Sequence, residues 1–108
     1  FEARNDDMII SSGYNIAGPE VESSLISHPA VFECAVIGVP DNNRGAIVEA
    51  YIVLANGFKK SEKIKKEIQD YVKGKIAPYK YPRSIVFINS LPKTKTGKIQ
   101  RFKLRKIK

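Results

Sequence analysis

The sequence predicts a small α+β domain, with a short N-terminal β-hairpin and a mostly antiparallel three-stranded sheet packed by helices. Residues 30–40 and 46–54 are almost continuous apolar runs rich in β-branched side chains, joined by the turn-forming segment PDNNRG. Such runs are typical of central strands with both faces covered. Residues 61–76 carry apolar side chains four apart, which indicates an amphipathic helix. The element order β-β-α-β-β-α-β favours helices packed on a mostly antiparallel sheet.

The first elements come from residues 6–29. The segment DDMIISSGYNI, residues 6–16, predicts two short strands around a glycine turn. The next segment, GPEVESSLISHP, starts with Gly-Pro followed by acidic residues, which is a helix start signal. Val21 and Leu25 share one face, so this helix is short and amphipathic, and it ends near His28 and Pro29.

The second half adds a longer helix and a third strand. Ser61 is the expected N-cap of the helix over 61–76. Residues 84–90, SIVFINS, form the third predicted strand, and the tail from Gln100 is expected to form a short helix. The apolar stripe of the helix consists of Ile64, Ile68, Val72 and Ile76.

Charge is distributed unevenly along the 108 residues. Residues 1–56 carry a net charge of −6 and residues 57–108 carry +14, which together give the overall +8. A strongly basic half suggests an anionic partner, for which nucleic acid, a membrane surface and a phosphorylated cofactor all qualify. Charge alone does not choose among them.

Length and composition limit the class of protein. A chain of 108 residues with 43% hydrophobic content fits one folded domain. Cys34 is the sole cysteine, so there is no disulfide framework, and a reducing, cytoplasmic location is expected. No apolar stretch approaches the roughly 20 residues that span a bilayer, and no signal peptide is visible. Because the chain lacks an initiator Met, we expect it to be a piece of a longer protein.

Several site types do not fit the sequence. A Walker-type phosphate loop needs Gly where Pro92 stands and Ser or Thr where Ile99 stands. Metal binding is not expected, because His28 and Cys34 are the only residues of their kinds, and His28 reads as a helix-end residue. No Ser/His/Asp or Cys/His set can be proposed. The pair Asp6-Asp7 reads as solvated turn residues.

Three polar segments stand out. Lys98 follows Gly97 in a turn that contains Thr residues. A lysine in a basic tail is ordinarily a solvated charge, but a preceding Gly can direct it into a site, where its ammonium would stabilise developing negative charge. Gly13 interrupts a strand pattern, which often marks close approach of the backbone to a ligand. The segment APYKYPR, residues 77–83, places two prolines around Tyr79 and Tyr81, and reads on its own as a stiff connector.

These motifs together carry a family resemblance that covers the whole chain. In order and spacing, RNDDMIISSGYNIAGPEVE, PDNNRG, APYKYPR and LPKTKTGKIQR resemble the C-terminal domain of the adenylate-forming acyl-CoA synthetases of the AMP-binding enzyme family. Medium-chain and aryl acyl-CoA ligases are the most similar members.

The resemblance implies a two-step, ATP-dependent reaction. A carboxylic acid and ATP give acyl-adenylate and pyrophosphate, and the thiol of CoA then displaces AMP. A large N-terminal domain is the implied partner of this chain; it holds the phosphate-binding loop, the acyl pocket and the expected Mg²⁺, which this domain does not bind. Residues 1–108 would be the mobile C-terminal domain, which swings between two poses and is expected to be inactive alone.

On the adenylation side, the resemblance implies three residues. Lys98 matches the catalytic lysine that bridges the carboxylate and the α-phosphate of ATP. Arg4 matches the arginine that touches the ATP ribose, and Asp6 matches the hinge between the two domains.

On the CoA side, the resemblance implies a strand that lines the thiol channel and a group near the CoA phosphates and nucleotide. Asn15 departs from the family pattern, since many relatives have Arg there, so we leave it off the site. The strand residues are Ser12, Gly13 and Tyr14; the basic positions are Arg44 and Lys73; the nucleotide stretch is Tyr81, Pro82 and Arg83.

Other functions stay open from the sequence. An adenylation domain that loads a carrier protein, or a luciferase-like oxygenase, would share the motifs. A stand-alone basic module that binds RNA or membrane would need exposed aromatics on its basic face, for which Tyr79 and Tyr81 are the candidates. Our expectation is a CoA ligase with no nucleic-acid partner and no stable insertion into a membrane.

Overall fold

The computed structural model describes residues 8–11, 13–97, 99 and 101–104. Its element order confirms the predicted α+β class, adds a 3-10 turn within APYKYPR, and confirms a short helix in the tail. The elements are β1 (Met8–Ser11), β2 (Tyr14–Ala17), α1 (Gly18–Ile26), β3 (Val31–Asp41), β4 (Gly45–Leu54), α2 (Glu62–Lys75), η2 (Pro78–Lys80), β5 (Ser84–Phe87) and α3 (Arg101–Leu104).

The strands form two separate sheets. β1 and β2 pair as an antiparallel hairpin, and the main sheet has the order β3-β4-β5. β3 and β4 are antiparallel, from Asp41 opposite Gly45 to Val31 opposite Leu54. β5 is parallel to β4, because the α2 crossover returns the chain to the same end of the sheet. The prediction of a mostly antiparallel three-stranded sheet is therefore confirmed.

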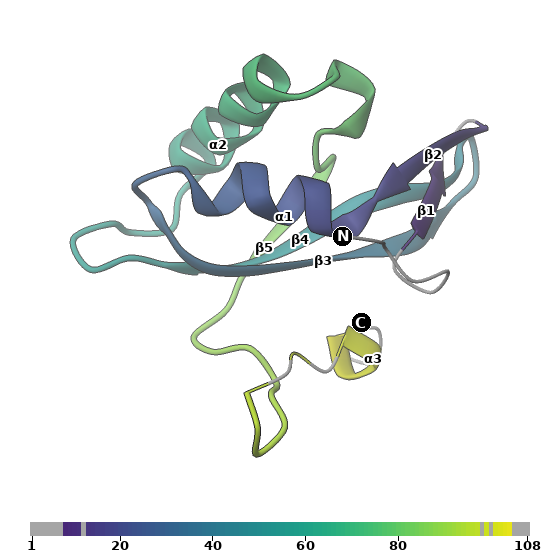
Figure 1. The fold of residues 1–108 in the computed structure, drawn as a ribbon. Helices are drawn as coiled ribbons and strands as arrows, with labels where there is room; N and C mark the ends of the chain where they lie inside the picture. Colours follow the sequence, from purple (N-terminus) through teal and green to yellow (C-terminus); the bar gives the residue numbers. More distant parts are fainter. Residues whose placement is uncertain (1–7, 12, 98, 100, 105–108) are drawn as a thin grey trace.

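Both faces of the main sheet are covered, as the apolar runs predicted. Helices α1 and α2 lie on one face, and α3 lies on the other (Figure 1). Alternate residues of β4 serve the two faces: Ala50 and Ile52 pack with α1 and α2, whereas Tyr51 packs with Leu104 of α3. All four side chains are fully buried.

Helix α2 begins and packs as its sequence predicts. The hydroxyl of Ser61 accepts a hydrogen bond from the backbone N–H of Ile64 at 3.2 Å, which confirms Ser61 as the N-cap. Ile68 and Val72 are fully buried against the sheet and α1, while the lysines of the helix face outward.

The β1–β2 hairpin is held by packing at its base. Ile9 and Ile16 are buried and belong to the main core. Gly38 of β3 lets this happen, because a Cβ at that position would lie 3.1 Å from a methyl carbon of Ile9. The position of the hairpin therefore depends on side-chain contacts, since in the described part of the chain β1 and β2 pair with each other and not with the main sheet.

A buried polar network joins β4, β5 and α3. Glu49 is fully buried, and its carboxylate accepts hydrogen bonds from the hydroxyls of Tyr51 at 2.8 Å and Ser84 at 2.9 Å. The Tyr51 hydroxyl also lies 3.2 Å from the carbonyl oxygen of Leu104. Burial, with a further contribution from Glu49, raises the pKa of Tyr51 to about 12.

Tyr51→Phe is expected to lower the stability of the 108-residue chain by about 1–3 kcal/mol at neutral pH, because Glu49 loses a buried donor. The raised pKa means that the folded state favours the neutral phenol. This contribution is complete below pH 10 and is lost as the pH rises from 10 through about 12. Urea unfolding at pH 7 and at several pH values above 10 should therefore show the gap between wild type and Tyr51→Phe narrowing.

Tyr71→Phe is the control for this experiment, because the Tyr71 hydroxyl bonds to Ser27 at an exposed position. If the gap between wild type and Tyr51→Phe stays constant above pH 10, Tyr51 does not titrate in the way described.

Candidate functional site

The turn between β1 and β2 exposes backbone at one end of the molecule. Gly13 has φ +82°, a left-handed conformation that favours glycine, and a Cβ placed there would meet no atom within 4 Å. Tyr14 follows at the start of β2 and is 54% exposed. This pair therefore leaves an open strip of chain at the turn.

Tyr14 does not stand alone at this turn. Its ring stacks on the ring of Tyr79 in η2, with centroids 4.4 Å apart and planes tilted by 30°. The sequence does not predict this contact, because 65 residues separate the two tyrosines and no local pattern links them. The stack joins the hairpin tip to the APYKYPR segment.

The same segment carries a cluster of cations around one ring. The ammonium of Lys73 lies 4.3 Å from the centroid of Tyr81, and the guanidinium of Arg83 lies 4.9 Å from it. Arg83 also donates to the Tyr81 hydroxyl at 3.1 Å. Pro82, which lies between Tyr81 and Arg83 in the sequence, is fully buried. Its carbonyl oxygen accepts a hydrogen bond from the side-chain amide of Gln69 at 3.0 Å. The structure thus brings together four of the residues predicted on the CoA side.

Arg44 comes to this end of the molecule from another element. It lies on the β3–β4 turn, where a carboxylate oxygen of Asp41 accepts from the backbone N–H groups of Asn43 at 3.1 Å and Arg44 at 2.9 Å. The turns of the β1–β2 and β3–β4 hairpins lie at the same end of the molecule (Figure 1). Cations from a turn, a helix and a connector therefore share one end, which suits a polyanion with several phosphates.

An ion pair fixes η2 to the first helix. The ammonium of Lys80 lies 2.7 Å from the carboxylate of Glu20 in α1. The hydrogen bond that Lys80 donates to the Glu20 carboxylate raises the pKa of Lys80 above its usual value, so this cation is engaged within the fold. This pair is not predicted from the sequence either, because its members are 60 residues apart.

Four predicted site residues lie outside the described residues: Arg4, Asp6, Ser12 and Lys98. The turn that precedes Lys98 is described. Gly97 has φ +90°, and its N–H donates to the carbonyl of Thr94 at 3.0 Å. Lys93 and Ile99 form an antiparallel bridge that closes the loop, and Lys93 pairs with Glu33 of β3. The predicted glycine turn is therefore present, at a defined place on the domain.

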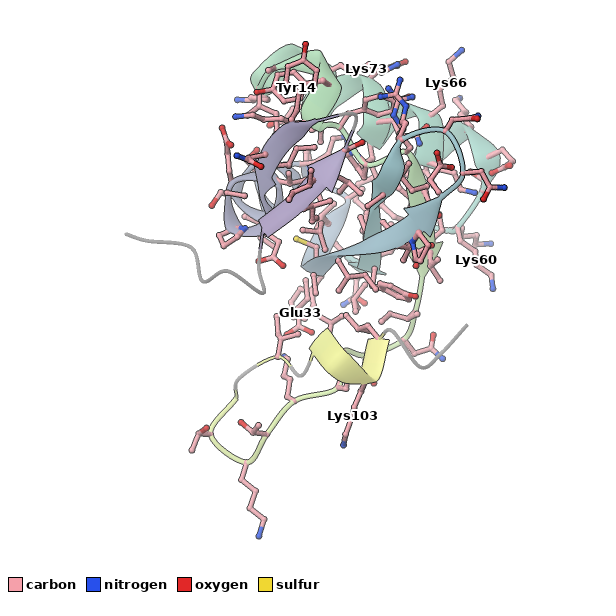
Figure 2. All side chains as sticks on the ribbon, turned by 90° about the vertical axis from the view of Figure 1, so that its right-hand side faces the viewer. Tyr14, Glu33, Lys60, Lys66, Lys73 and Lys103 are labelled. Carbon is pink, nitrogen blue, oxygen red and sulfur yellow. The ribbon has the colours of Figure 1, made fainter. Side chains whose placement is uncertain are left out.

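The Thr94–Gly97 turn and the Gly13 turn lie at opposite ends of the domain. Figure 2 shows Tyr14 and Lys73 at the top. The yellow-green loop with the Thr94–Gly97 turn projects from the bottom of the molecule, below the labelled Glu33. Phe32, beside Glu33, is 65% exposed. One domain therefore presents two separate polar turns at two separate ends.

His28 has a local structural role. Its Nδ1 accepts a hydrogen bond from the backbone N–H of Ala30 at 3.0 Å, and its ring meets the ring of Tyr71 edge-on. This confirms His28 as a helix-end residue.

Within the described ranges there is no group of three or more His, Cys, Asp or Glu side chains that could hold a metal ion. In the same part of the chain, every helix is too short or too polar to cross a membrane.

Comparisons with known proteins agree with this arrangement. Residues 20–98 match the model of the AMP-binding enzyme C-terminal domain. The acyl–CoA ligase YtcI of Bacillus subtilis, described as uncharacterized, is 58% identical over 106 residues, which cover 98% of this chain and 20% of that protein. The mitochondrial acyl-coenzyme A synthetase ACSM4 of Rattus norvegicus is 59% identical over 107 residues, 97% of this chain and 18% of that protein.

A solved structure gives the same picture. The Brucella canis acyl-CoA synthetase superposes with a TM-score of 0.92 at 50% sequence identity, over 99% of this chain and 20% of that chain. This chain thus spans about a fifth of the length of the proteins that it matches. The family model covers residues 20–98, which is most of the chain. The chain therefore belongs to the AMP-binding enzyme C-terminal domain family.

Proposed function

We propose that the longer protein containing this chain is an acid–CoA ligase, which converts a carboxylic acid, ATP and CoA to acyl-CoA, AMP and pyrophosphate. The observation that carries the proposal is the pair of glycine turns at opposite ends of one domain, at Gly13 and Gly97. Each suits one of two consecutive reactions, and a domain that rotates between them can serve both at a single active site.

In the first step, a carboxylate oxygen attacks the α-phosphorus of ATP and pyrophosphate leaves. Negative charge develops between the carboxylate and the α-phosphate, and the ammonium of Lys98 would stabilise it there. The turn that precedes Lys98 is supported by the bridge between Lys93 and Ile99 and by the ion pair of Lys93 with Glu33. Arg4 would contact the ribose and Asp6 would act as the hinge; Mg²⁺ would belong to the N-terminal domain.

In the second step, the thiol of CoA attacks the acyl carbon and AMP leaves. Ser12, Gly13 and Tyr14 would line the channel for the thiol arm, where the missing Cβ at Gly13 leaves room. The CoA phosphates and nucleotide would meet cations at the same end of the domain. Those residues are Arg44, Lys73, Tyr81, Pro82 and Arg83.

The proposal is tested by assaying the full-length protein with ATP, CoA and a panel of medium-chain and aryl acids. The expected result is acyl-CoA formation that requires both ATP and CoA. If the protein adenylates the acid but transfers the acyl group only to a carrier protein and not to free CoA, it is an adenylation domain that loads a carrier protein, and the proposal of a CoA ligase is wrong.

The basic-module alternative receives less support from the geometry. The ring of Tyr79 is stacked on Tyr14, and that of Tyr81 is contacted by two cations, so both rings already have partners. Platforms for stacked bases need accessible ring faces. We further propose a cytoplasmic location on the basis of the single buried thiol of Cys34, which fits a reducing compartment. Fractionation of the producing cell tests this against the mitochondrial location named for ACSM4.

Replacing Arg44 or Lys73 with Ala is expected to raise the KM for CoA in the full-length protein. Charge-assisted contacts are worth roughly 1.5–3 kcal/mol each, so the shift should be about tenfold or more. The KM for ATP should hardly change. Steady-state kinetics with each substrate varied in turn make the measurement.

Lys75→Ala is a matched control, because Lys75 lies in the same last turn of α2 and also places its ammonium over a tyrosine ring, that of Tyr71, at 5.4 Å. Its substitution should leave the KM for CoA unchanged. If Arg44→Ala or Lys73→Ala raises the KM for ATP as much as the KM for CoA, these residues act on folding or domain motion instead.

A further inference from the structure

We propose that Tyr79 is a positioning residue that holds the wall of the CoA thiol channel in place through its stack on Tyr14. This inference rests on the function proposed above. It adds a residue that acts through Tyr14 and does not itself touch the reacting atoms. It also adds a physical link between the channel wall and the cations expected at the CoA nucleotide.

The channel wall gains from such a support because, of the described pair next to the turn, Ser11 is buried but small and its partner Tyr14 is 54% exposed. β1 and β2 form a sheet separate from β3-β4-β5, and their buried anchors, Ile9 and Ile16, lie on the strands away from the turn. At the turn, Gly13 offers no side chain and the space around it is open. Among the described residues, the aromatic contact at this tip is the stack of Tyr14 on Tyr79, with ring centroids 4.4 Å apart.

Tyr79 is suited to this role because its own backbone and surroundings are fixed. It lies in the middle of η2, where the N–H of Lys80 donates to the carbonyl of Ala77 at 2.9 Å. The next residue, Lys80, is tied to Glu20 of α1 by the 2.7 Å ion pair. The Tyr79 ring is itself partly buried against the main core. A ring held by the η2 backbone and by the core is therefore presented to the tip of the hairpin.

The position of Tyr79 also links two parts of the CoA site. Tyr81, two residues further on, holds the ammonium of Lys73 and the guanidinium of Arg83 over its ring. The short η2 connector thus sets the distance between the channel wall at Tyr14 and this cation cluster. Loss of the stack should weaken CoA binding without touching the adenylation step, which uses the opposite end of the domain.

The test uses the full-length protein with Tyr79→Ala and Tyr79→Phe. Aromatic pairs of this kind have a coupling that corresponds to about a two- to tenfold change in an equilibrium constant. We therefore expect Tyr79→Ala to raise the KM for CoA by about that factor, with pyrophosphate exchange unchanged. Tyr79→Phe should restore the KM, because the contact is between ring faces.

Two further variants separate positioning from other roles. Tyr14→Ala combined with Tyr79→Ala should raise the KM for CoA no more than the larger single change, since both remove the same stack. Tyr71→Ala removes a ring from a different aromatic pair, the edge contact with His28 at 4.9 Å, and should leave the KM for CoA unchanged.

An unchanged KM for CoA in Tyr79→Ala would overturn the inference and leave the proposed function intact. The same holds if Tyr79→Ala slows both half-reactions equally and Tyr71→Ala has the same effect. Fully additive effects of Tyr14→Ala and Tyr79→Ala would overturn it as well, because Tyr79 would then act independently of the stack. Failure of the wild-type protein to form acyl-CoA would instead refute the proposed function, and the inference with it.

Discussion

Replacing Lys98 with Ala in the full-length protein is expected to slow adenylation by about 10²–10³-fold, the usual loss when one stabilising donor is removed from developing charge in a water-poor site. The reason is that carboxylate and α-phosphate oxygens come together in this step, and a fixed ammonium offsets their repulsion. Acyl-dependent exchange of labelled pyrophosphate into ATP measures the step directly.

Lys95→Ala is the matched control for this substitution. Lys95 is exposed and occupies the same Thr94–Gly97 turn, so its loss removes an equal charge from the same loop. Pyrophosphate exchange in Lys95→Ala should stay within about twofold of wild type, as for ordinary surface substitutions. If both variants lose activity equally, the net charge of the loop matters and the position of Lys98 does not.

Gly13→Leu is expected to have the opposite selectivity, with thioester formation reduced by at least about 10²-fold and adenylation retained. A leucine side chain would fill the open space beside the turn, through which the thiol arm of CoA is proposed to pass. Transfer from synthetic acyl-adenylate to CoA measures the second step, and pyrophosphate exchange measures the first.

Backbone strain needs a separate control, because Gly13 has φ +82° and any side chain there is disfavoured. Gly57 provides it: its φ is +93°, it also has open space around it, and it lies in the loop between β4 and α2. Gly57→Leu should impose similar strain and leave both half-reactions unchanged. A matching loss of thioester formation in Gly57→Leu would show that strain, and not a blocked channel, explains the result for Gly13.

Much of the fold could be predicted because local patterns and burial agree. The strands β3 and β4 are nearly all apolar because both faces are covered, by α1 and α2 on one side and by α3 on the other. The stripe of α2 and its cap at Ser61 were also readable, since both depend on residues within one or two turns. The lack of a side chain permits the positive φ found at Gly13 and Gly97, although Gly38 and Gly74 show that it does not require one.

The parts that could not be predicted depend on contacts between distant residues. Glu49 interrupts an apolar strand, and only the fold reveals that the hydroxyls of Tyr51 and Ser84 meet its carboxylate. The stack of Tyr14 on Tyr79 is similar, because either tyrosine alone reads as an ordinary amphipathic side chain. Residue roles on the adenylation side came from the resemblance to a family, since a lysine after a glycine has no unique chemical meaning.

The proposed function requires one domain to serve two reactions by presenting two different ends in turn. Its most direct test is the rate at which full-length Lys98→Ala converts synthetic acyl-adenylate and CoA to acyl-CoA. If Lys98 has left the active site by this step, the rate should equal that of wild type even though pyrophosphate exchange is lost. A thioester step slowed as much as adenylation would contradict the alternation of poses, and Lys98 would then be a structural or merely solvated lysine.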